Sequence, residues 1–131
     1  MNEHGVQWIV EFTIKESKLD DFKSITQEIT KLVKLNESGA KSYQWFFSDD
    51  ETKCIITEWY LDQEAALAHL NGEGVIKLLP KLLEIADITR LEIYGNPGEE
   101  AKTRLEKLGA KSFHFFTGFT RCINKTTKNI I

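Results

Sequence analysis

The stretch TEWYLDQEAALAHL (residues 57–70) begins with the character of a strand and ends with that of a helix. The segment CIITEWY (54–60) is rich in β-branched and aromatic residues, which favour strands. Asp62 is a suitable N-cap for a helix over QEAALAHL (63–70). The stretch also contains four side chains suited to catalysis or to contact with an aromatic ligand, namely Glu58, Trp59, Tyr60 and His69. It is therefore a joint between two elements and a candidate pocket wall.

Periodicity predicts the elements before this joint. Residues 6–14 alternate, with Trp8 among the apolar side chains of one face, and this period of two predicts a strand. Apolar residues recur every three or four positions through residues 15–39, which predicts an amphipathic helix with Ser17 as its N-cap and Gly39 as its stop. The aromatic-rich segment 40–48 predicts a second strand, joined to residues 54–60 by a turn at 49–53.

The elements after the joint follow from breaks in the same patterns. NGEG (71–74) interrupts the helix, and VIKLLPKLLEI (75–85) resumes helical spacing, with a kink or a new start expected at Pro80. Residues 87–95 predict a strand, 95–98 a turn, 99–109 a short helix and 111–119 a fifth strand.

The order β-α-β-β-α-β followed by α-β predicts an α+β, ferredoxin-like fold with an added C-terminal unit. We expect one domain over 1–131, with a core at 5–95, an extension at 96–120 and a tail at 121–131. Both main helices should cover one face of the sheet. Ile55 and Trp59 fall on the opposite side of their strand from Ile56 and Tyr60, so the second face is also apolar. A second copy of the chain would cover it as a homodimer, and the alternative is that the fifth strand or the tail folds across it.

Charge and composition argue against several classes of binding partner. The net charge of −3 argues against a nucleic-acid partner. No apolar run reaches the length of a membrane span, and no signal peptide is recognisable, so we expect no membrane partner and a cytoplasmic location. Cys54 and Cys122 are then expected to be free thiols. No spacing typical of metal ligands appears, and the glycines of NGEGV do not form a nucleotide-binding motif.

The opening stretch resembles the antibiotic biosynthesis monooxygenase family of dimeric α+β barrels, also called quinol monooxygenases. Many members carry Glu, one residue, an aromatic residue and then a helix that ends in His-Leu, as Glu58, Tyr60 and His69-Leu70 do here. The resemblance spans residues 5–95. It implies a homodimer, an apolar cavity between sheet and helices, and oxygenation of polycyclic phenols without metal, flavin or haem. The haem-degrading branch needs an Asn on the first strand and a His within 74–83, and both are missing.

An oxygenase of this kind must form a phenolate at neutral pH, which requires a base in a dry pocket. Glu58 is the candidate base and His69 a candidate proton relay, so both are predicted as catalytic. The alternatives are that Glu58 forms a structural pair with a cation such as Arg90, and that His69 lies on the surface or caps its helix. Substrate contacts are predicted from the aromatic side chains Tyr43, Trp45, Trp59 and Tyr60. Neighbours on a strand point oppositely, so Glu58 and Trp59 cannot line the same side.

The resemblance therefore implies a cofactor-independent monooxygenase that acts on a quinol-like or other aromatic small molecule. Two alternatives remain: a non-catalytic barrel that binds a hydrophobic metabolite, and a dimeric interaction module whose cavity is filled by its own side chains.

Overall fold

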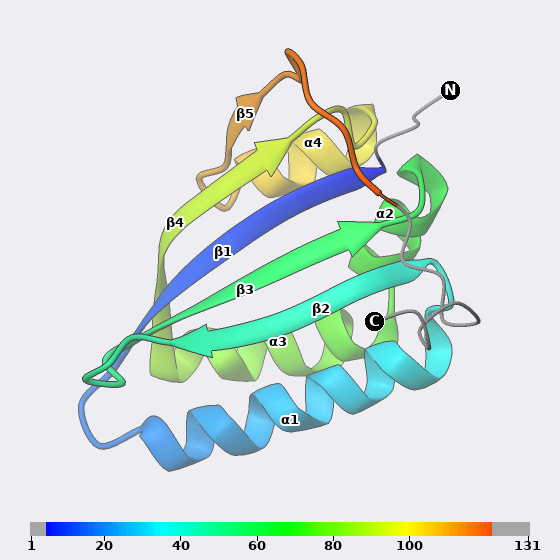
Figure 1. Ribbon diagram of the computed structural model, residues 1–131. Coiled ribbons are helices and arrows are strands. Elements are labelled where there is room, and N and C mark those ends of the chain that lie inside the picture. The colour runs from blue at the N-terminus through cyan, green and yellow to red at the C-terminus, as the bar shows by residue number, and fades with distance from the viewer. Residues whose placement is uncertain (1–4, 122–131) are drawn as a thin grey trace, which may run out of the picture.

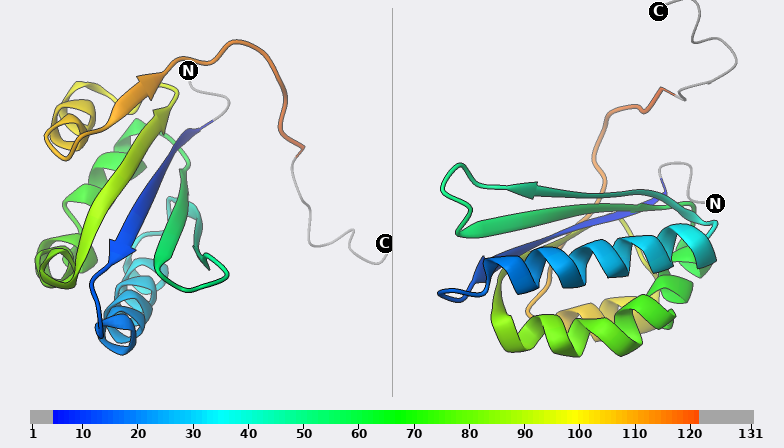
Figure 2. Two further views of the ribbon diagram at one scale, coloured as in Figure 1. Left: turned by 90° about the vertical axis from the view of Figure 1, so that its left-hand side faces the viewer. Right: turned by 90° about the horizontal axis from the view of Figure 1, so that it is seen from below.

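The computed structural model describes residues 5–121, so Cys122 and nearly all of the expected tail lie outside it. In chain order, the elements are β1 (Val6–Ile14), α1 (Leu19–Asn36), β2 (Ala40–Phe47), β3 (Lys53–Tyr60), α2 (Gln63–Leu70), α3 (Glu73–Ile85), β4 (Ala86–Tyr94), α4 (Glu99–Glu106) and β5 (Lys111–Phe113). The sheet order is β2-β3-β1-β4-β5. The helices α1, α3 and α4 lie against one face (Figures 1 and 2). The predicted α+β, ferredoxin-like fold is confirmed.

Strand alternation directs one set of side chains under the helices. In β1, Trp8 and its apolar neighbours at every second position are buried. In β3 the buried positions are Cys54, Ile56, Glu58 and Tyr60, so a carboxyl group belongs to the helix-covered set. The antiparallel register aligns Glu58 with Trp8 on β1 and with Tyr43 on β2. One row across the sheet thus carries an acid between two aromatic residues.

Helix boundaries agree with the local signals at some points and correct them at others. The Asp62 side chain accepts a hydrogen bond of 2.8 Å from the backbone N–H of Ala65 and caps α2 as predicted. Ser17 is not the cap of α1, because it has a φ of 61° and Lys18 occupies the N-cap position. Pro80 does not start a new helix. It lies on the exposed side of α3, where water can satisfy the carbonyl that proline leaves unpaired.

Gly39 does not end α1, which stops at Asn36 with Glu37 as its C-cap. Gly39 is required here because it has no side chain. A Cβ atom at Gly39 would lie 2.5 Å from the Cβ of Ala65, so only glycine allows this close approach of β2's entry to α2. That approach fixes the position of α2 and of every side chain on it.

The predicted fifth strand over 111–119 is much shorter in the structure. Only Lys111–Phe113 pair, in parallel with the end of β4, and the chain then runs away from the body of the molecule (Figure 2). An edge strand has a partner on one side only, and the later residues find no strand to extend the ladder. Four phenylalanines of this segment are exposed: Phe113, Phe115, Phe116 and Phe119.

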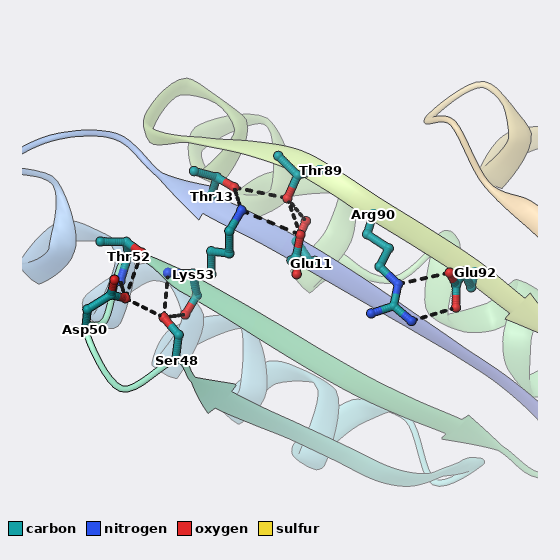
Figure 3. Close-up of polar contacts among 9 residues, drawn as sticks. All are labelled: Glu11, Thr13, Ser48, Asp50, Thr52, Lys53, Thr89, Arg90 and Glu92. Atoms are coloured by element: carbon teal, nitrogen blue, oxygen red, sulfur yellow. Dashed lines mark hydrogen bonds and ion pairs between the residues drawn. The ribbon is translucent and has the colours of Figure 1, made fainter.

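The face of the sheet away from the helices combines polar networks with apolar side chains. Glu11 accepts a hydrogen bond of 2.7 Å from Thr89 and lies 3.8 Å from the Lys53 ammonium group (Figure 3). Arg90 binds Glu92 through two contacts of 2.9 and 3.1 Å. Phe46 of the edge strand β2 is also exposed. We call this surface the open face.

Candidate functional site

A cavity lies between the sheet and the helices, and its walls are mainly apolar. It is lined by side chains from strands β1–β4 and helices α1–α3, and by Leu105 and Leu108 of the C-terminal extension. Its volume is about 60 Å³, which is room for about four water molecules. The polar side chains with ionisable groups on its walls are Tyr43, Glu58 and His69. The cavity therefore has one reactive end.

Glu58 is the acid at that end. It is 6% exposed, and its Oε1 accepts a hydrogen bond of 2.5 Å from the Tyr60 hydroxyl. Burial raises the pKa of Glu58, because the charged carboxylate loses its hydration. His69 and polar contacts from Tyr60 and Trp8 act in the opposite direction but only in part. Such a carboxyl group holds its proton to a higher pH than an exposed glutamate and is a stronger base once ionised.

His69 connects Glu58 to a second acid. The imidazole is 3% exposed, with Nε2 lying 3.3 Å from Glu58 Oε1 and Nδ1 lying 2.8 Å from Glu37 Oε1. Two arrangements satisfy both contacts: an imidazolium between two carboxylates, or a neutral imidazole between the Glu37 carboxylate and a protonated Glu58. They differ by the position of one proton, so Glu58 and His69 can exchange it.

Glu37 was missed by the sequence analysis. It is the C-cap residue of α1, where the helix dipole disfavours a negative charge. An acid in that position is a weak signal of a role elsewhere, and here the role is the contact with His69. Its other oxygen lies against Gly72, where a Cβ atom would approach to 2.5 Å. The joint between α2 and α3 is thus shaped around this carboxylate.

The two tyrosines next to Glu58 are held neutral. Burial, followed by the nearby charge of Glu58, raises the pKa of both Tyr43 and Tyr60 well above the usual value. Tyr60 is fully buried and stacks on Trp8, with ring centroids 4.8 Å apart. Neutral phenols are hydrogen-bond donors. Tyr43, on the cavity wall, can therefore stabilise an anion in the cavity, while the Tyr60 hydroxyl donates to Glu58.

The structure brings most of the predicted site residues together. Tyr43, Trp45, Glu58 and His69 line the cavity, and Tyr60 lies behind Glu58. Trp59 does not belong to this group, since strand alternation turns it to the open face. The indole N–H of Trp45 donates a 2.8 Å hydrogen bond to the Thr30 hydroxyl.

The structure corrects the partners named in the two alternatives, and a structural role of Glu58 in a pair with His69 stays an alternative to the catalytic one. Arg90 lies on the open face and pairs with Glu92, so it is not the partner of Glu58. His69 is buried and is held by side chains, so it is neither a surface residue nor a helix cap.

We expect Glu37 to fix the imidazole. In Glu37→Ala, the Nδ1–H group loses an acceptor, and its exchange with water measured by nitrogen NMR should accelerate by about tenfold or more, in line with a charge-assisted hydrogen bond. Glu37→Gln retains an acceptor and should show a smaller change. Equal exchange rates in all three proteins would show that Glu37 does not hold His69.

Among residues 5–121, no group of three or more His, Cys, Asp or Glu side chains is placed to hold a metal ion. No helix in this part of the chain combines the length and apolarity needed to cross a membrane. Cys54 is a buried free thiol, and burial raises its pKa to about 11.

Comparison with known proteins places the chain in a family. The model of the family described as antibiotic biosynthesis monooxygenase matches residues 6–78, which include Glu37, Glu58 and His69. The chain belongs to this antibiotic biosynthesis monooxygenase family. The match ends within α3, so the walls contributed by β4 and α4 lie outside the part shared with the family model.

Solved structures extend the comparison for this family member. MupZ from Pseudomonas fluorescens has a TM-score of 0.77 at 25% identity, over 91% of this chain and 96% of that protein. A conserved protein from Methanosarcina mazei Go1 has a TM-score of 0.63 at 17% identity, over 69% and 90%. A Bacteroides thetaiotaomicron protein of unknown function, described as a possible oxidoreductase, has a TM-score of 0.63 at 20% identity, over 70% and 97%. No curated protein matches the chain.

Proposed function

We propose that this member of the antibiotic biosynthesis monooxygenase family is a cofactor-independent monooxygenase that acts on a phenolic or quinol-like small molecule. The observation that carries the proposal is a buried carboxyl–imidazole pair, Glu58 and His69, at the polar end of an apolar cavity. The absence of a cofactor is what the family resemblance implies, since the oxygenating members let the substrate anion reduce oxygen.

Ionisation of the substrate is the task of the chain's own residues. A phenol in water has a pKa near ~10, so little phenolate exists at neutral pH. Glu58 accepts the phenol proton: the phenol O–H bond breaks, a carboxyl O–H bond forms, and His69 can take that proton onward. The Tyr43 hydroxyl on the cavity wall stabilises the resulting oxyanion as a neutral donor.

Oxygenation then draws from the substrate all four electrons that the reduction of O₂ requires, two for each oxygen atom. The phenolate transfers electron density to O₂, a ring carbon forms a bond to one oxygen atom, and the O–O bond breaks. One oxygen atom stays on the ring carbon as a hydroxyl group, and the other leaves as water with the two hydrogens lost by the substrate. For naphthoquinol the products are hydroxynaphthoquinone and water.

The test uses naphthoquinol with ¹⁸O₂ and the full chain. We expect hydroxynaphthoquinone that contains one heavy oxygen atom, formed faster than in buffer. His69→Gln should reduce the rate, while Glu28→Gln, at an exposed position of α1, should not. Oxidation to plain naphthoquinone with hydrogen peroxide, at the rate seen in buffer, would contradict the monooxygenase. Binding without labelled product would favour the non-catalytic barrel instead.

The proposal also includes a homodimer built on the open face. It is supported by the apolar side chains that this face leaves accessible, Phe46 among them, and by the barrel formed by dimers in this family. In Ile55→Arg, a charge would enter that interface. We expect light scattering to give two chains for the parent protein and one for the variant, with the fold retained. Leu35→Arg, at a position 76% exposed on α1, should stay dimeric, and a monomeric parent would contradict the homodimer.

A further inference from the structure

The cavity changes in chemical character from one end to the other. Its reactive end is the row Tyr43–Glu58–Trp8 on β2, β3 and β1, with His69 above it. Its other end is formed by aliphatic side chains alone: Leu79 and Leu82 of α3, Leu91 of β4, and Leu105 and Leu108 of the extension. Two strand spacings, about 10 Å, separate β3 from β4, so the two ends are distinct subsites.

The aliphatic end also carries the most exposed side chain of the lining. Leu108 is 39% exposed although it lines the cavity, and every other lining side chain is less exposed. Helix α4 is held over this end by Arg104, which donates hydrogen bonds to the Leu70 carbonyl at 2.8 Å and to Asn71 at 2.6 Å. The apolar face of α4, with Leu105 buried, therefore closes the cavity on this side.

The volume limits what can lie between these ends. A cavity of about 60 Å³ is smaller than an apolar cavity of ~150 Å³ that holds a benzene ring. A ring or an alkyl chain of several carbons must therefore displace part of the wall. The one lining side chain already half in solvent is Leu108, and its movement costs the least burial.

We propose that the aliphatic end is a tail subsite: the substrate is an amphiphile whose acidic head faces Glu58 and whose alkyl chain lies between α3 and α4, against Leu79, Leu105 and Leu108. This inference rests on the proposed function for the identity of the head group. The tail subsite itself is formed by residues beyond 78, so it belongs to the part of the chain that the family model does not cover.

The test is a homologous series of para-alkylphenols, from methyl to octyl, titrated without oxygen against the full chain by calorimetry. We expect affinity to rise by up to about fourfold per added methylene, the factor that corresponds to ~0.8 kcal/mol per buried CH₂, until the tail subsite is filled. Leu108→Gln should flatten this rise, and Leu108→Trp should make it end at a shorter chain. Leu35→Gln, on the far side of the helices, should leave the series unchanged.

A parallel series of alkylbenzenes separates this inference from the proposed function. These probes have no acidic head, so their dependence on chain length reports the tail subsite alone, whatever the outcome with ¹⁸O₂. An affinity that does not rise with chain length, or no binding by any member, would overturn the tail subsite. So would a rise of equal slope in the parent protein, Leu108→Gln and Leu108→Trp, since the chain would then lie elsewhere.

Discussion

Replacing Glu58 by glutamine should lower the turnover number with naphthoquinol by about 10²- to 10⁴-fold, the usual contribution of a positioned general base. The glutamine amide has the same size and can still accept the hydrogen bond from Tyr60, but it cannot bind the substrate proton. Steady-state oxygen uptake measures the loss. Glu28→Gln, an exposed site on α1, is the matched control and should keep full activity. A fall of less than about threefold would show that another group removes the proton.

The same substitution should not weaken the fold at neutral pH. Because burial raises the pKa of Glu58 in the folded state, the folded protein binds the proton more tightly than the unfolded chain does. The stability that this group contributes is therefore fully present at pH values below the ordinary pKa of glutamate. It is lost as the pH rises through the raised pKa of Glu58 in the folded protein. The amide has no such dependence, so the melting temperature of Glu58→Gln relative to the parent protein should increase across that window. A variant that becomes relatively less stable as pH rises would contradict the raised pKa.

Trp8→Ala should cause the largest loss of stability. The indole is 2% exposed, stacks on Tyr60 and forms part of the cavity floor, so its removal leaves a large void under α2 and α3. Truncation of a buried tryptophan costs about 3–5 kcal/mol. Chemical denaturation should show this decrease in the free energy of unfolding.

The control for this prediction is Leu35→Ala on the solvent side of α1, which should stay within about 0.5 kcal/mol of the parent protein. A loss below about 1 kcal/mol in Trp8→Ala would indicate that the neighbouring side chains collapse into the space, and that the floor of the cavity is not rigid.

Strong periodic signals predicted the elements of the fold. Alternation in residues 6–14 gave β1 its bounds, and the Asp62 cap gave the start of α2, because both depend on residues adjacent in the chain. Ser17 and the fifth strand show the limit of such signals. Ser17 is a favourable cap residue, but it lies one residue before the N-cap position of α1. Residues 114–119 have strand-like composition but no neighbouring strand to pair with.

The acid at the centre of the site could be named from the sequence, but its environment could not. Glu58 lies in a strand beside aromatic residues, which is enough to suggest a desolvated base. Its pairing with His69 depends on how α2 packs on the sheet. Glu37 comes from the far end of α1, twenty-one positions upstream of Glu58, and the helical period there predicts the helix but not the contact with His69. Which of Glu58 and Trp59 faces the cavity also depends on the strand register, and the structure turns Glu58 toward the helices.

The central claim is that Glu58 is a poised carboxyl group facing a ligand in the cavity, and infrared difference spectroscopy across a pH titration tests it most directly. The account predicts one protonated carboxyl band that persists above the ordinary glutamate range, is absent from Glu58→Gln, and shifts when naphthol is added. A Glu58 carboxyl that ionises in the ordinary range and does not respond to naphthol would contradict the account.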